Sequence, residues 1–83
     1  MRRLGKHVRE LRHDKGISQE TAAEIAEMET RQWQAIEAGS KNVTLASLLA
    51  IARCLGVSLS QLLEGAYPRI RITSTRGAVR RAK

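Results

Sequence analysis

Residues 18–39 read SQETAAEIAEMETRQWQAIEAG, and this stretch decides the fold. Ser18 is a residue type that caps helix N-termini, and the helix that it opens is expected to end near Ala26. A second helix is expected over residues 30–38, and Gly39 stops it because glycine readily adopts the left-handed conformation of a C-cap. The stretch therefore predicts two short helices joined by a tight turn, with small residues where the helices must cross closely.

The residues before this stretch predict a first helix over about residues 2–15. Leu4, Val8 and Leu11 recur at intervals of four and three, so they share one face of a helix. Gly16 is expected to end this helix.

The residues after the stretch predict two more helices. Thr44 is expected to cap the fourth helix, and Gly56 to end it. Ser58 is expected to cap the fifth, with Gln61 completing a capping box three residues later, and Gly65 to close it. Caps, glycines and apolar spacing agree with one another, which favours an all-α fold.

The charge and the sequence pattern of the chain change after the fifth helix. We expect residues 1–65 to form one compact five-helix domain and residues 66–83 to form a basic C-terminal extension. The extension has no acidic residue, Pro68 blocks helix continuation, and residues 69–73 alternate Arg with Ile, which predicts a strand. A lone strand is not stable in water, so it must pair with another copy, pack on the helices or stay disordered. Six of the 15 Lys and Arg residues lie there: Arg69, Arg71, Arg76, Arg80, Arg81 and Lys83.

Composition argues against several classes of protein. The single cysteine, Cys54, allows no internal disulfide, and a packing role is expected for it. His7 and His13 fall on different faces of the first helix, and no catalytic set, zinc spacing or phosphate-binding loop is present. We therefore expect no enzyme, no metal and no cofactor. We expect no signal peptide, because the N-terminal residues are charged, and no membrane span, which suggests the cytoplasm.

The pattern resembles the lambda-repressor-like (Xre-type) helix-turn-helix DNA-binding family over residues 4–64. In that family the second helix of the motif enters the major groove of DNA. The matching residues are Leu11-Arg12, Gly16-Ile17-Ser18-Gln19-Glu20, Ala23, Met28, Trp33, Ile36-Glu37-Ala38-Gly39, Lys41-Asn42-Val43-Thr44-Leu45, Leu48-Leu49, Ala52 and Leu55-Gly56-Val57-Ser58.

The resemblance implies roles for particular residues. Arg and Gln suit base edges because they can bond guanine and adenine bidentately. Arg12 and Glu37 match a pair that ties the first helix to the third. The implied base-reading residues are Gln19, Thr30, Arg31, Gln34 and Ala35, and the implied phosphate contacts are Ser18, Ser40, Lys41 and Asn42.

Two positions depart from the family pattern. The turn usually holds Gly where this chain has Glu27, and a non-Gly residue is strained in a left-handed conformation. The third helix usually starts with Ser or Thr where this chain has Glu29. Both carboxylates would stand near DNA phosphates and oppose binding, so the basic extension is expected to compensate.

The leading hypothesis is a sequence-specific regulator that binds double-stranded DNA as a homodimer on a palindromic operator. The fifth helix and a strand containing Ile70 and Ile72 would form the dimer surface. A DNA-binding antitoxin with a toxin protein as partner, and a controller protein of a restriction system, remain open. A protein-interaction module that has lost DNA binding is the alternative from another class.

Overall fold

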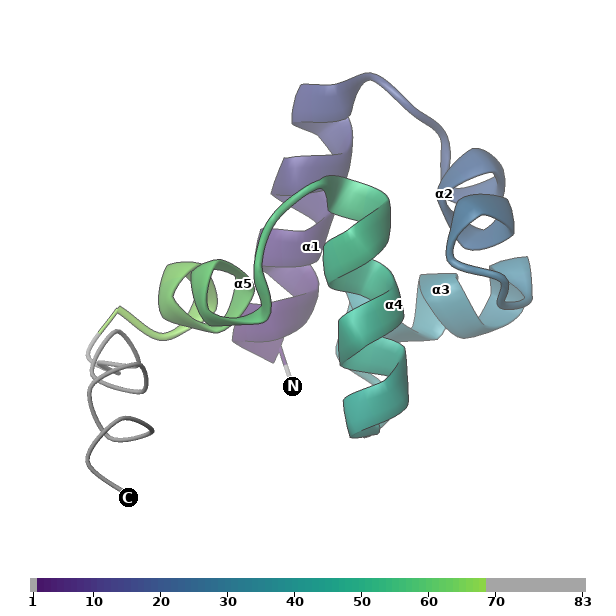
Figure 1. Ribbon diagram of the computed structural model, residues 1–83. Helices are drawn as coiled ribbons and strands as arrows, with labels where there is room; N and C mark the ends of the chain where they lie inside the picture. Colours follow the sequence, from purple (N-terminus) through teal and green to yellow (C-terminus); the bar gives the residue numbers. More distant parts are fainter. Residues whose placement is uncertain (1, 69–83) are drawn as a thin grey trace, which may run out of the picture.

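The computed structural model describes residues 2–68, which form five helices (Figure 1). The helices are α1 (Arg2–Lys15), α2 (Gln19–Ile25), α3 (Thr30–Ala38), α4 (Leu45–Leu55) and α5 (Leu59–Ala66). These bounds confirm the predicted helices, and residues 2–68 contain no strand. The strand predicted for residues 69–73 lies outside the described residues.

The helix ends follow the predicted caps. Ser18, Thr44 and Ser58 each accept a hydrogen bond from the backbone N–H three residues later. The capping box of Ser58 and Gln61 is complete, because the Gln61 side chain also accepts from the Ser58 backbone at 2.8 Å. Gly39 ends α3 with φ 73°, in the left-handed region.

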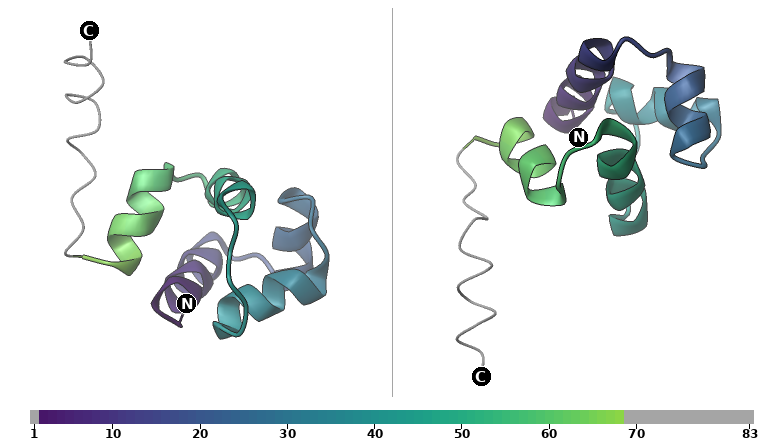
Figure 2. Two further views of the ribbon diagram at one scale, coloured as in Figure 1. Left: turned by 90° about the horizontal axis from the view of Figure 1, so that it is seen from below. Right: turned by 45° about the horizontal axis from the view of Figure 1, so that its top comes forward.

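α1 lies at the centre of the domain and contacts α3, α4 and α5, while α2 packs on α3 and α4 (Figures 1 and 2). Every helix except α2 contributes at least one large, fully buried side chain. α2 contributes Ala22 and Ala23 instead, which let it pack closely. The fully buried large side chains are Leu4, Val8, Trp33, Ile36, Ile51 and Leu62.

Gly65 was expected to close α5, and this is wrong. α5 continues to Ala66, and Tyr67 is its C-cap. Gly65 lies inside the last turn, where an added Cβ would meet the end of the His7 imidazole on α1. The glycine thus serves a close helix crossing rather than a helix end.

Gly5 serves a second close crossing, between α1 and α3. A Cβ at this position would lie 2.6 Å from the carbonyl oxygen of Glu37. Real Cβ atoms do not approach an oxygen so closely, so a larger residue would push α1 and α3 apart. This crossing fixes α3 against the central helix.

Within residues 2–68, no single helix is long and apolar enough to cross a membrane. Only α4 and α5 taken together pass that test, by length and composition alone, and they are bent by 97° relative to each other.

Candidate nucleic-acid interface

α3 has one buried face and one polar face, as its sequence predicted. Trp33 and Ile36 are 0% and 2% exposed and point into the core. Arg31 and Gln34 are exposed, and Thr30 and Ala35 are half-buried beside them. We call the surface formed by Gln19, Thr30, Arg31, Gln34 and Ala35 the reading face.

An ion pair beneath the reading face joins α1 to α3. The Arg12 Nε donates to Glu37 Oε2 at 2.6 Å, and Nη2 donates to Oε1 at 3.2 Å. The two side chains are only 9% and 4% exposed. The indole Nε1 of Trp33 donates to the same Oε2 at 2.5 Å. The sequence interpretation placed Trp33 in the core but missed this bond, which its spacing of four residues from Glu37 could have suggested.

The carboxyl of Glu37 is held in its charged form. Burial raises the pKa of Glu37, but hydrogen bonds from Arg12, Gln19 and Trp33 and the charge of Arg12 outweigh burial. The net effect is a pKa below its usual value. Glu37 is therefore an acceptor for every donor around it at neutral pH.

Hydrogen bonds connect the ion pair to two glutamines of the reading face. Gln19 Nε2 donates to Glu37 Oε1 at 2.9 Å, and Gln34 Nε2 donates to Gln19 Oε1 at 3.3 Å. An ionised carboxylate accepts only, so the amide nitrogen of Gln19 must face it and the amide oxygen must point toward Gln34. The buried carboxylate thus sets the orientation of both amides.

The expected phosphate-contacting residues lie at the two ends of the motif. The Ser18 hydroxyl accepts from the backbone N–H of Thr21 at 3.1 Å as the cap of α2. The Ser40 hydroxyl donates to the Ala35 carbonyl at 3.3 Å. Lys41 and Asn42 are exposed in the loop after α3.

The two departures from the family pattern have clear structural consequences. Glu27 has φ 58°, which confirms the left-handed conformation expected of a turn position that usually holds glycine. Glu29 is the N-cap of α3, but its side chain makes no capping hydrogen bond. Within residues 2–68, neither carboxylate has a hydrogen bond or an ion pair.

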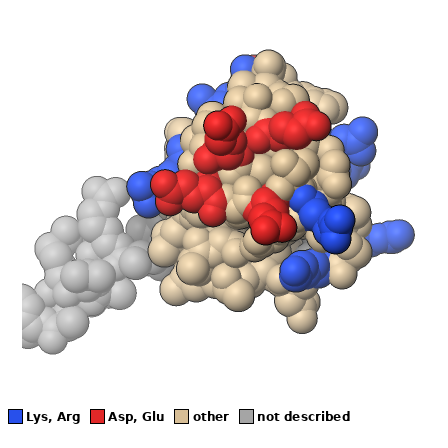
Figure 3. Space-filling model, turned by 90° about the vertical axis from the view of Figure 1, so that its right-hand side faces the viewer, with Lys and Arg blue, Asp and Glu red and all other residues tan. Residues whose placement is uncertain are grey.

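Acidic side chains gather on the side of the molecule that carries α2 and the following turn (Figure 3). The exposed carboxylates of this region are Glu20, Glu24, Glu27 and Glu29. No ion pair is present for these four among the described residues. The acidic side chains would repel DNA phosphates that approach α2 from this side.

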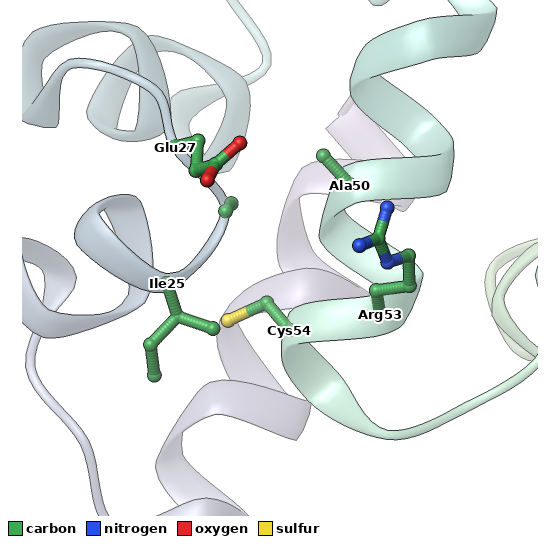
Figure 4. Close-up of a pocket in the computed structure, with 6 residues that line it drawn as sticks. Ile25, Glu27, Ala50, Arg53 and Cys54 are labelled. Atoms are coloured by element: carbon green, nitrogen blue, oxygen red, sulfur yellow. The ribbon is translucent and has the colours of Figure 1, made fainter.

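A pocket of about 230 Å³ separates α2 and its turn from α4 (Figure 4). Ile25 and Cys54 line it, and Glu27 and Arg53 stand on opposite walls. Cys54 is 5% exposed, which confirms its packing role, and burial raises the pKa of its thiol despite the nearby charge of Lys15. A neutral, buried thiol is a poor nucleophile.

Metal-ligating side chains do not converge in the part of the chain that the structure describes. No group of three or more His, Cys, Asp or Glu residues there could hold a metal ion. His13 is exposed and lies 3.2 Å from the Arg12 guanidinium, while His7 packs against α5.

The sequence matches one family model and two control proteins. A family model described as a helix-turn-helix domain matches residues 3–64. The control protein C.MunI of a Mycoplasma species is 36% identical over 63 residues, which cover 75% of this chain and 85% of that protein. The control protein C.SmaI of Serratia marcescens is 35% identical over 60 residues, which cover 72% of this chain and 71% of that protein.

Solved structures of two regulators also match this chain. The crystal structure of the restriction-modification controller protein C.AhdI from Aeromonas hydrophila matches with a TM-score of 0.71 and 35% identity. The match covers 72% of this chain and 91% of that one. The clp gene regulator ClgR from Corynebacterium glutamicum matches with a TM-score of 0.76 and 25% identity, over 96% of this chain and 85% of that one.

Proposed function

We propose that this chain, which belongs to the helix-turn-helix domain family and is a DNA-binding transcriptional regulator, is the controller protein of a restriction–modification system. The observation that carries the proposal is its similarity to two control proteins and one such controller, at 35–36% identity and over most of their lengths. We infer that it acts by binding DNA and not by catalysis.

Gln34 is proposed to read adenine in the major groove. One N–H of its amide is used on Gln19, so the amide oxygen and the second N–H remain for a base. An adenine edge offers a donor at N6 and an acceptor at N7, which match this pair. Gln19, held by Glu37, keeps Gln34 in that orientation.

The other members of the reading face are proposed to complete the recognition. The exposed guanidinium of Arg31 can bond O6 and N7 of guanine, and Thr30 can donate or accept one hydrogen bond. Ala35 offers only a methyl contact, which suits thymine. Lys41 and Asn42, with Ser18 and Ser40, are proposed to bind phosphates on either side.

We propose that two copies pair through α4. Leu45 and Leu49 are 64% and 46% exposed and lie four residues apart, so they share one face. α5 buries Leu62, and its other leucines are half-buried. A two-fold pairing would cover the same α4 leucines on both copies and place two reading faces on a palindromic site. The contribution expected from Ile70 and Ile72 stays a prediction, because they lie outside the described residues.

The dimer can be tested by sedimentation equilibrium. Wild type should show twice the 9.2 kDa chain mass, and Leu45→Glu with Leu49→Glu should sediment as a monomer with unchanged helix content. The control is Ile25→Glu, since Ile25 is also exposed (55%) but lies on α2. A double α4 variant that stays dimeric would contradict this interface.

A regulator of genes other than restriction and modification genes is the second candidate. It is favoured by the match to ClgR, which covers 96% of this chain. A toxin partner remains an alternative that co-purification would detect.

The proposed function is tested by selecting from a random duplex library with the full-length chain at about physiological salt. A palindrome that recurs upstream of neighbouring restriction or modification genes supports the controller. A palindrome found only at other promoters favours the second candidate. Binding without any enriched sequence, or no binding, contradicts sequence-specific regulation.

A further inference from the structure

A hollow opens beside the reading face, between α1, the start of α2 and α3. Its volume is about 340 Å³, and its lining side chains include both glutamines of the hydrogen-bonded series. The lining residues are Arg9, Arg12, Gln19, Gln34, Glu37 and Ala38. The hollow therefore borders the base that Gln34 would read.

The charge of the hollow comes from one residue. Arg12 and Glu37 neutralise each other at 2.6 Å. Arg9 is exposed and has no hydrogen bond or ion pair within residues 2–68. The hollow thus carries one uncompensated positive charge beside two neutral amides, which is an environment that suits an anion.

The positions of the lining residues leave room beside Arg9. Arg9 lies three residues before Arg12, on the same side of α1. Gln34 and Ala38 lie four residues apart and form the α3 wall, where Ala38 ends in a methyl group. A guanidinium at such an edge can bond two oxygens of one phosphate in a fork.

We propose that Arg9 binds a backbone phosphate of the DNA in this hollow, so that α1 holds the duplex while α3 reads it. The inference rests on the proposed function, because it assumes that the reading face meets DNA. It adds a contact from outside the two helices of the motif and predicts no change in which bases are read.

The test is the salt dependence of binding by the full-length chain, with Arg9→Gln and Arg9→Lys. The probes are the best duplex selected from the random library and a mixed-sequence duplex of the same length. Arg9→Gln should make the negative slope of log affinity against log salt shallower by about 1.8 for a homodimer. Each phosphate contact contributes about 0.9, and a homodimer would lose two such contacts. Arg9→Lys should keep the slope, because it keeps the charge.

The matched control is Arg3→Gln, which removes the same charge from an exposed position on α1 that does not line the hollow. Melting temperatures of both Gln variants should equal that of wild type, since neither side chain has a partner among residues 2–68. An equal loss of slope in both variants, an unchanged slope in Arg9→Gln, or an altered base preference in Arg9→Gln would each overturn the proposal.

If wild type selects no sequence, the proposed function fails. If wild type selects one and the Arg9→Gln slope is unchanged, only the Arg9 contact fails.

Discussion

Arg12 on α1 and Glu37 on α3, 25 residues apart in the chain, form an ion pair that is almost closed to solvent. Glu37 accepts from three side chains, since Trp33 and Gln19 donate to it as well. The pair therefore links the central helix, the core and the reading face. Removing Arg12 and removing Glu37 leave different groups without a hydrogen bond. The two single variants should therefore lose different amounts of folding free energy.

Glu37→Leu should destabilise the domain more than Arg12→Met. Without Glu37, three buried or half-buried donors lose their acceptor, and a buried charge remains unpaired, at a cost of about 3–5 kcal/mol. Arg12→Met also leaves a buried charge unpaired and removes the 2.9 Å bond to the Ile17 carbonyl. Glu37 keeps the donors Gln19 and Trp33, however, so this variant should cost less. The double variant should lose less than the sum of the two, as measured by urea unfolding. A double-mutant cycle with no coupling would show that the pair is energetically independent.

The same carboxyl predicts a loss of stability in acid. The pKa of Glu37 is lower in the folded state than in the unfolded state, so its contribution is fully present above the ordinary Glu value of about 4.3. The contribution is lost as the pH falls through that value toward the lower folded-state pKa. The free energy of unfolding should therefore fall more steeply for wild type than for the Arg12→Met, Glu37→Leu double variant. Parallel pH profiles from about pH 6 to 3 would argue against this assignment.

Local signals in the sequence predicted the helices, because caps, glycines and apolar spacing act within a few residues. The sequence could not predict the roles of Gly5 and Gly65, which depend on packing between helices distant in the chain. The bond from Gln19 to Glu37 spans 18 residues and has no local signal. The base and phosphate contacts remain predictions, since they depend on bound DNA.

Gly65→Ala should lower the melting temperature although alanine usually favours helices. The added Cβ needs the space of the His7 ring, which must turn aside, and forcing such groups apart typically costs about 1–3 kcal/mol. The second change His7→Ala in the Gly65→Ala background should restore part of the stability, because it empties the space. Equal melting curves for wild type and Gly65→Ala would mean that the ring moves aside freely.

Glu27→Gly should raise the melting temperature. Glu27 has φ 58°, a conformation that costs a non-Gly residue about 1–2 kcal/mol, whereas glycine adopts it freely. Glycine also gains freedom in the unfolded chain, so the net gain should be about 0.5–1 kcal/mol. Glu27→Ala is the control, because it removes the same charge but keeps a Cβ at φ 58° and so gains nothing from relieved strain. A melting temperature that stays level or falls in Glu27→Gly would show that strain at this turn is compensated elsewhere.

Truncation after Pro68 should weaken DNA binding and flatten its salt dependence. The removed residues carry six basic side chains and no acidic one, while the acidic side that contains α2 stays on the domain. Cutting after Pro68 keeps α5 intact, since that helix ends at Ala66. The salt slope, measured on the selected duplex, should fall by about 0.9 for every phosphate that the shortened protein no longer neutralises. A full-length variant with all six basic residues changed to Gln should match the truncation, because charge and not chain length is the cause. A truncated protein with the wild-type slope would show that the five helices alone supply the phosphate contacts.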